Sequence, residues 1–268
     1  MVWKEMKKLI AAAWLAIVVP ALAAPEPPPH VYNATALKAV RKIGNDLFDT
    51  LDEKYQKKVD PDMIRLGLVD APVITPVPGD DENKALNQIF ISVGFIDLIN
   101  HIAHARAIDG IQPGYFAQYV LNLAHDKGTD APPEPPDMVD NRYWNDEVMN
   151  DQITYFNQIL SMTMAISLAH SYLGHFAKYS NQMLAGKLVP ITTFLAPAEW
   201  ESSLKAATLN SLNCAEGTDG LKSLFEAIDK MPNRPAWTAF MVPPATDLKK
   251  LNKQLKKYED DFFHGRLN

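Results

Sequence analysis

Apolar residues recur every three to four positions along most of this chain, a spacing that is typical of amphipathic helices. The first such stretch predicts a helix from about Thr35 to Lys58, and Asp60-Pro61 ends the pattern. Further helices are predicted over residues 95–108, 115–124, 145–179, 197–212, 218–230 and 247–263. The stretch 145–179 is long enough for either one helix or two stacked ones.

Two short segments have the β-branched and aromatic composition of strands instead. Residues 89–93 (Ile-Phe-Ile-Ser-Val) are the stronger candidate, and residues 64–69 are the second. Between them, the prolines and the glycine of residues 72–79 predict a turn, and four prolines in residues 128–136 predict a surface loop. The pattern as a whole predicts a predominantly helical α+β fold with a small sheet.

The N-terminus has the three parts of a secretory signal peptide. Residues 1–8 carry three lysines, residues 9–23 are apolar, and Ala21-Leu22-Ala23 offers a small-x-small cleavage site. The apolar run of about 15 residues is shorter than the roughly 20 that span a bilayer; an uncleaved membrane anchor is the alternative. We therefore expect a signal peptide over 1–23, a proline-rich spacer over 24–33 and one helical domain over 34–268, in a secreted or periplasmic protein.

Composition removes several functional classes. The net charge of −6 and the lack of an isolated basic stretch argue against binding to nucleic-acid phosphates. The single cysteine, Cys214, excludes an intramolecular disulfide and a cysteine-based zinc site. Because no glycine-rich phosphate loop and no catalytic triad stands out, the histidines are the main candidates for chemistry.

One candidate metal site lies in the predicted helix 95–108. Asp97, His101 and His104 fall within about 60° of one another around an ideal helix, so all three face the same way. Carboxylates and imidazoles together bind divalent metals. The alternative is a polar stripe in which Asp97 accepts a hydrogen bond from His101.

A second candidate lies near the end of the stretch 145–179. His170 and His175 are five residues apart, so on an unbroken helix they point about 140° away from each other. One metal ion is not expected to bind both of them in that case. His170 either joins ligands from another helix or is a hydrogen-bonded core residue.

The order of segments around these histidines resembles the gluzincin metallopeptidases, the branch with CAAX prenyl proteases and periplasmic quality-control proteases. The resemblance rests on Met63–Asp70, Asn83–Asn87 and Ile89–Asp97, which match a strand, a turn and a substrate-edge strand leading into a glycine-started helix. In that family an HExxH helix follows, whose two histidines bind zinc while its glutamate activates water. The resemblance implies a zincin-like domain and a zinc cofactor.

The match to the zinc motif is incomplete. His170 fits the second histidine of HExxH and Glu201 fits the third zinc ligand, whereas Ile166 and Ser167 replace the first histidine and the catalytic glutamate. Lys205 replaces the aspartate that usually follows the third ligand. About 60 additional residues separate the glycine-started helix from the His170 helix. An isoleucine cannot coordinate zinc and a serine is a poor proton acceptor, so ordinary peptidase activity should be lost.

Three functions follow as hypotheses. The first is a non-proteolytic protein that binds a polypeptide or an envelope partner, by strand addition to residues 89–93. The second is a metal-dependent hydrolase with a rebuilt site, and the third is a structural envelope protein without a site. Nucleic acid is not an expected partner. A membrane is an expected partner only if the signal peptide remains uncleaved as an anchor. The rebuilt site would draw its ligands from His170, Glu201, His175, His101 and His104, with Asp97 as a further ligand or as a base beside Glu147 and Glu199.

Overall fold

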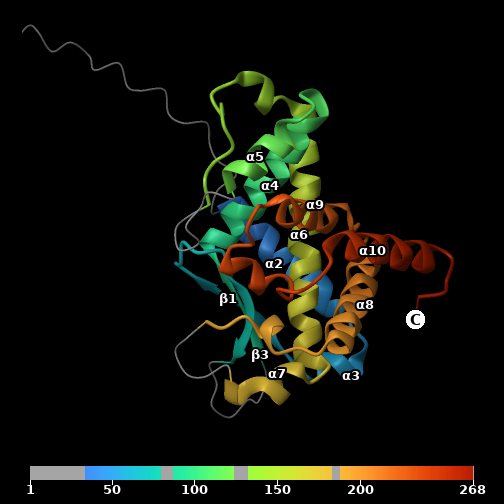
Figure 1. Cartoon of the computed structure of the whole chain (residues 1–268). Coiled ribbons are helices and arrows are strands. Elements are labelled where there is room, and N and C mark those ends of the chain that lie inside the picture. Colours follow the sequence, from blue (N-terminus) through green and yellow to red (C-terminus); the bar gives the residue numbers. More distant parts are fainter. Residues whose placement is uncertain (1–33, 80–86, 124–131, 183–187, 268) are drawn as a thin grey trace, which may run out of the picture. The chain divides into compact units, whose positions relative to one another are not determined.

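The structure is a computed structural model, and it describes residues 34–79, 87–123, 132–182 and 188–267. The predicted signal peptide and spacer lie outside these ranges. The described residues belong to one compact unit in which helices pack beside a small sheet (Figure 1). The predicted fold class, a predominantly helical α+β protein, is confirmed. None of the helices in the described ranges has both the length and the apolar character that crossing a bilayer requires.

The sheet has three strands, in the order β1-β3-β2. The central strand β3 (Asn87–Ser92) is parallel to β1 (Val59–Gly67) and antiparallel to β2 (Ile74–Pro78). A strand was predicted at this place, but not its position in the sheet. Because both edges of β3 are already paired, the expectation that residues 89–93 offer an open edge to a polypeptide is wrong.

Strand β2 occupies most of the segment that was predicted as a proline-rich turn. The carbonyl of Val73 accepts a hydrogen bond from the Ser92 N–H at 2.9 Å. In an antiparallel pair, the backbone N–H and C=O groups of alternate residues point to the same neighbouring strand. Those of Thr75 and Val77 therefore point to β3, whereas the backbone nitrogens of Pro76 and Pro78 point to the unpaired edge of β2. Proline is tolerated there because an outward position needs no N–H donor. The prolines also remove two donors from this edge of the sheet.

Helix α4 (Val93–Ile111) starts directly after β3. The Ser92 hydroxyl accepts a hydrogen bond from the Phe95 N–H at 3.0 Å and so caps the helix. Gly94 is required here, because a Cβ at this position would lie 1.7 Å from the Asp70 carbonyl oxygen. Most of α4 is buried on all sides, which makes it a central helix of the domain rather than an amphipathic surface helix.

Helix α6 (Asp146–Tyr172) is the longest helix among the described residues and the second central one (Figure 1). The Asn145 side chain caps its start by accepting a hydrogen bond from the Val148 N–H at 2.9 Å. Every residue from Ile159 to Tyr172 is buried, because α6 packs against α4, α8, α9 and the sheet. The long apolar pattern therefore reflects a helix that is enclosed by its neighbours.

The predicted first helix is divided in the structure. α2 (Ala34–Asp49) ends where the Thr50 hydroxyl donates to the Asp46 carbonyl oxygen at 3.0 Å, and a single turn, α3 (Glu53–Gln56), precedes β1. The peripheral helices are α5 (Tyr115–Leu123), α7 (His175–Tyr179), α8 (Pro197–Asn213), α9 (Asp219–Lys230) and α10 (Leu248–Phe263). Short 3-10 helices lie at Asn141–Trp144, Ser180–Gln182, Ile191–Thr193 and Ala236–Phe240.

Candidate functional site

A break in the helix that carries His170 determines the shape of the candidate site. α6 ends at Tyr172, and Gly174 adopts a left-handed conformation with φ 84° before α7 starts at His175. A non-glycine residue is strained in this region of φ. The turn interrupts the helix and changes the direction of the chain between α6 and α7. His175 therefore approaches His170, whereas an unbroken helix would point the two side chains apart.

The two histidines meet at one serine of helix α8. The Ser203 hydroxyl oxygen lies 2.9 Å from Nδ1 of His170 and 3.0 Å from Nδ1 of His175, and the two Nδ1 atoms are 3.5 Å apart. Both contacts are satisfied when one imidazole donates its Nδ1–H to the Ser203 oxygen and the hydroxyl donates to the other Nδ1. We call these three residues the histidine cluster. It joins the end of α6, the start of α7 and the first half of α8.

Burial holds both imidazoles in the neutral form at pH 7. His170 is 1% exposed, and this burial, together with the neighbouring His175, lowers its pKa to about 3 against a smaller opposing effect of Glu199. Burial also lowers the pKa of His175, again opposed by Glu199. Neutral imidazoles can accept as well as donate hydrogen bonds, which the contacts to Ser203 require.

One atom of the histidine cluster has no hydrogen-bond partner among the described residues. Nε2 of His170 is buried and unpaired. A cavity of about 10 Å³, lined in part by Thr163, Ser167 and Ile74, borders the same imidazole. This is about the smallest volume that holds one water molecule. A single water in this cavity would satisfy the unpaired nitrogen.

Glu199 fixes the start of α8 beside the histidine cluster. Its carboxylate accepts hydrogen bonds from Lys178 at 2.6 Å, from the Tyr179 hydroxyl at 2.8 Å and from the Ala196 N–H at 2.8 Å. Partial desolvation raises the pKa of Glu199, but these hydrogen bonds outweigh it and lower the pKa to about 2. Glu199 is therefore ionised and fully engaged, which makes it a poor general base.

The predicted third ligand lies away from the histidine cluster. Glu201 is exposed on α8 and accepts a hydrogen bond from the Gln254 side chain of α10 at 2.9 Å. Since Glu201 and Ser203 are two residues apart, they point to different sides of α8. The helix thus presents Ser203 to His170 and turns Glu201 toward α10.

The candidate metal ligands on α4 are not gathered into a metal site among the described residues. His104 is buried and its Nε2 lies 2.7 Å from the Tyr143 carbonyl oxygen, which makes it a hydrogen-bonded core residue. His101 is also buried, and Asp97 is half-buried. Within the ranges that the structure describes, no group of three or more His, Cys, Asp or Glu side chains is gathered closely enough to hold a metal ion. The six-residue ligand set is therefore not assembled.

Ser203 was missed by the sequence reasoning. A signal for it exists in the pattern of α8, where Ser203 lies on the same buried face as Trp200, Leu204 and Ala207. A hydroxyl on a buried apolar face needs a hydrogen-bond partner from another element. Because Ser203 is 0% exposed, its hydroxyl cannot reach a substrate, and the cluster does not form a serine nucleophile with its base.

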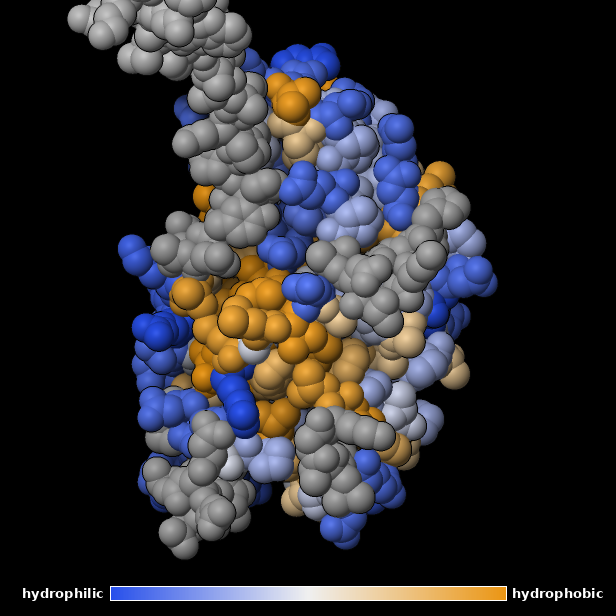
Figure 2. Space-filling view, turned by 90° about the vertical axis from the view of Figure 1, so that its left-hand side faces the viewer, coloured by the Kyte–Doolittle hydropathy of each residue, from blue (hydrophilic) through white to orange (hydrophobic). Residues whose placement is uncertain are grey.

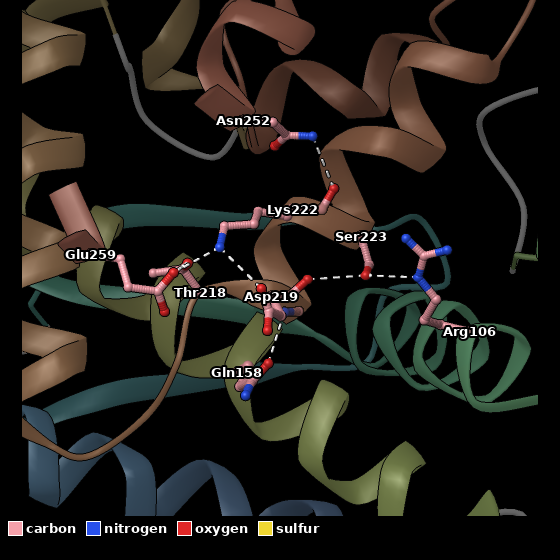
Figure 3. Close-up of polar contacts among 9 residues, drawn as sticks. Arg106, Gln158, Thr218, Asp219, Lys222, Ser223, Asn252 and Glu259 are labelled. Carbon is pink, nitrogen blue, oxygen red and sulfur yellow. Dashed lines mark hydrogen bonds and ion pairs between the residues drawn. The ribbon is translucent and has the colours of Figure 1, made fainter. Parts of the chain in front are cut away.

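A second polar cluster surrounds a cleft of about 400 Å³ near the start of α9 (Figure 3). Its two cations are paired: Lys222 with Asp219 at 3.0 Å and with Glu259 at 2.8 Å, and Arg106 with Glu226. Arg106 also donates to the Ser223 hydroxyl at 3.2 Å. These contacts join α9 to α4 and α10. Both cations are thus paired with carboxylates of the cluster, and these contacts account for helix packing and indicate no ligand.

The geometry defines a helical α+β protein with a buried histidine cluster in its core. No protein-family model matches the chain, and no curated protein or solved structure matches it either. The gluzincin resemblance therefore remains a hypothesis.

Proposed function

We propose that this chain is an exported, non-proteolytic protein that binds an extended polypeptide segment along the outer edge of β1. The observation that carries the proposal is the sheet order, in which β1 has a neighbouring strand on one side only within the described residues. The backbone groups of an edge strand are a template for a further strand. The usable part is Ile64–Gly67, because a register shift separates Val59 from Ile64.

Apolar side chains accompany this edge. Leu66 is 38% exposed and Leu68, just after the strand, is 94% exposed. Figure 2 views the molecule from the side of the sheet and shows a broad apolar area at mid-height. An extended segment with alternating apolar residues would bury such side chains while its backbone pairs with β1. The other edge of the sheet is less suitable, since Pro76 and Pro78 lack N–H donors there.

The surroundings of the candidate catalytic residues, within the part of the chain that the structure describes, favour binding over hydrolysis. Ile166 and Ser167, at the places of the first zinc ligand and the catalytic base, are both buried in α6. Glu199 is engaged with Lys178, and Glu201 with Gln254. The candidate residues thus offer no carboxylate that could activate water beside His170.

A peptide pair tests the proposal. The probe is a fluorescein-labelled peptide of alternating Val and Lys, and its matched control has N-methyl groups on alternate residues, which remove the donors of one edge. We expect saturable fluorescence anisotropy with the first peptide only. Equal binding of both peptides, or no binding of either, would overturn strand addition and favour a structural envelope protein.

Substitutions localise the binding edge. Leu66→Lys and Leu68→Lys place positive charge beside β1, where it repels the lysines of the probe, and should weaken peptide binding by about tenfold or more. Leu121→Lys is the matched control, because Leu121 is 52% exposed on α5, outside the sheet. Binding that survives both edge variants would show that the peptide uses another surface.

We propose a structural metal site at the histidine cluster as the second candidate function. Two nitrogen ligands on a tetrahedral zinc ion with bonds of 2.0–2.1 Å lie about 3.3 Å apart. The two Nδ1 atoms are separated by 3.5 Å, and the Ser203 oxygen lies 2.9 Å from that of His170 and 3.0 Å from that of His175. His170, His175 and Ser203 would hold the ion. With no free carboxylate beside it, such an ion would stabilise the fold rather than hydrolyse peptides.

Cobalt substitution tests the metal site without relying on activity. Metal-free protein is titrated with Co²⁺, and the intense visible absorption of tetrahedral cobalt is recorded. The site is supported if one equivalent of Co²⁺ produces this spectrum in the parent protein and in His104→Gln but not in His175→Gln. A spectrum of free hexaaqua cobalt in the parent protein rejects it.

A further inference from the structure

Helix α10 presents a face of lysines to solvent, on the side of the domain opposite β1 (Figure 1). The helix packs on α8 and α9 through the buried side chains of Leu248, Leu251, Leu255 and Tyr258. Its five lysines are all exposed, namely Lys249, Lys250, Lys253, Lys256 and Lys257. At the helical spacing of 3.6 residues per turn, these five positions fall within an arc of about 120°, opposite the buried side chains. We call them the lysine face.

The positive charge of the lysine face is largely unpaired. Residues 248–257 contain no Asp or Glu. Lys249 lies 3.9 Å from Asp229 of α9, but its side chain is 83% exposed. No ion pair joins the other four lysines to a carboxylate in the part of the chain that the structure describes. The face therefore carries a local excess of positive charge, although the chain as a whole has a net charge of −6.

The acids that follow the lysines in sequence are mostly engaged elsewhere. Glu259 pairs with Lys222 of α9 at 2.8 Å, and Asp261 pairs with Arg266 at 2.9 Å. Asp260 is exposed on the same side of α10 as the lysines, at the C-terminal end of the helix. It opposes five positive charges with one negative charge, so the lysine face stays cationic.

This arrangement of lysines does not help the helix to form. Lys249 and Lys257 each lie four residues from Lys253, so like charges repel along one side of the helix. Lys249 and Lys250 lie in the first turn, where the helix dipole favours acids, and the first turn of α10 contains no acid. Because these positions oppose helix stability, folding does not account for them. An anionic partner outside the domain does.

An exposed aromatic ring ends the lysine face. Phe263 is 72% exposed, and its ring packs edge-on against that of Phe262 with 5.5 Å between the centroids. Phe263 follows Lys256 by seven residues, which places the two on the same side of the helix. Cations beside an exposed aromatic residue are typical of helices that lie in the interface between a membrane and water. The aromatic ring thus favours a lipid surface over a soluble anion.

We propose that the lysine face and Phe263 bind the surface of a bilayer that contains anionic lipids. The ammonium groups face the lipid phosphates, and the Phe263 ring lies among the headgroups. Clusters of about four to eight basic residues on an amphipathic helix are typical of such binding. The sequence suggested a membrane contact only through an uncleaved anchor, whereas α10 provides one that needs no anchor. The inference does not depend on the polypeptide-binding proposal, because α10 and β1 share no residue and lie on opposite sides of the domain in Figure 1.

Flotation with lipid vesicles tests the inference on the full chain. The probes are vesicles of equal parts phosphatidylglycerol and phosphatidylcholine, and vesicles of phosphatidylcholine alone. We expect at least about tenfold higher affinity for the anionic vesicles, and loss of this preference in about 1 M NaCl, where the screening length is about 3 Å. Equal binding to both kinds of vesicle, or binding to neither, would overturn the inference.

Two pairs of substitutions locate the contact. Lys253→Gln with Lys256→Gln should weaken binding to anionic vesicles about tenfold or more, because each lysine near such a surface contributes about fivefold. Lys54→Gln with Lys57→Gln removes the same charge at α3, where the side chains are 67% and 71% exposed, and should leave the affinity within about twofold. The lysines and the apolar run of residues 1–23 are identical in all variants, so they do not affect the comparison. Equal affinity of the two double variants would place the contact elsewhere and reject the lysine face.

A further variant separates a bilayer from a soluble polyanion. Phe263→Ser should weaken vesicle binding about fivefold, because the ring no longer enters the headgroup layer, and should leave binding to heparin unchanged. Leu121→Ser is the control, since it removes a 52% exposed apolar side chain from α5. Unchanged vesicle affinity in Phe263→Ser, or binding to heparin without binding to vesicles, would assign the lysine face to a soluble polyanion and overturn the inference. Unfolding midpoints near that of the parent show that a weaker affinity is not caused by misfolding.

Discussion

Nδ1 of His170 and Nδ1 of His175 lie 3.5 Å apart, although five residues of continuous helix would direct these side chains away from each other. The approach depends on the left-handed turn at Gly174 and on Ser203, whose hydroxyl contacts both nitrogens. The Ser203 hydroxyl and the two buried Nδ1 atoms thereby satisfy one another in the core. The same contacts fix where α6 stops and how α7 and α8 meet it.

The turn at Gly174 should be sensitive to any side chain. Gly174→Ala is expected to lower the free energy of unfolding by about 1 kcal/mol, because an L-residue is strained at φ 84° even though the space around a Cβ is open. Gly110→Ala is the control: its Cβ also meets open space, but the residue is helical. Urea unfolding should show Gly110→Ala equal to or more stable than the parent. Equal loss in both variants would contradict the role of φ.

Removing the Ser203 hydroxyl should lower the free energy of unfolding more than removing the hydroxyl of its exposed neighbour Ser202. Ser203→Ala leaves two buried imidazole nitrogens without their partner, and we expect a loss of about 1–3 kcal/mol in the free energy of unfolding. Ser202→Ala, one position earlier on the exposed side of α8, should change it by less than about 0.5 kcal/mol. Chemical denaturation of both variants in the presence of chelator measures the difference. A neutral Ser203→Ala would contradict a stabilising role of the hydroxyl.

The prolines of β2 should protect the second edge of the sheet. Pro78→Thr restores an N–H donor at an exposed, outward-facing position, so self-association through this edge should increase. Pro244→Thr replaces an exposed proline outside the sheet and serves as the control. Light scattering over a concentration series should detect larger species only for Pro78→Thr. Monomeric Pro78→Thr at all concentrations would indicate that the edge is covered by other means.

The fold class could be predicted because long helices can be recognised from the spacing of apolar residues, without knowledge of tertiary contacts. The places of α5, α8, α9 and α10 follow closely from apolar spacing and capping residues. Strand β2 could not be predicted, because prolines normally mark turns and are allowed here only by an edge position that the sequence does not reveal. The order of strands, and hence the central position of β3, is likewise a tertiary property.

The candidate site was predicted only in part, for a related reason. His170 and His175 stood out by type and spacing, but their approach depends on the backbone conformation of Gly174, and helical geometry alone gave the opposite direction. Glu201 was carried over from a family pattern, whereas the side of α8 that faces α6 is decided by packing. The spacing of Ser203 and Trp200 along the helix indicates that Ser203 lies on the buried face of α8. It does not indicate which residue the Ser203 hydroxyl contacts.

Acid should destabilise the protein before its carboxylates titrate. Burial lowers the pKa of His170 to about 3 and also lowers that of His104, whereas both residues have pKa values near 6.5 when the chain is unfolded. The unfolded state therefore binds more protons than the folded state below about pH 6.5, so the free energy of unfolding falls as the pH drops from 6.5 toward the folded pKa. His170 alone should account for about 2 kcal/mol between pH 7.5 and pH 5.

Urea unfolding at pH 7.5 and at pH 5, in the presence of chelator, measures this loss. Replacing a buried histidine by a residue that does not titrate removes its share of the pH dependence, so His104→Gln should show a smaller difference between the two pH values than the parent. Ser202→Ala should keep the parent difference, because this exposed residue has no titratable group. The comparison uses the difference between pH values within each variant, so a general loss of stability in His104→Gln does not affect it. An unchanged pH difference in His104→Gln would mean that this imidazole takes up its proton in the folded protein as readily as in the unfolded chain.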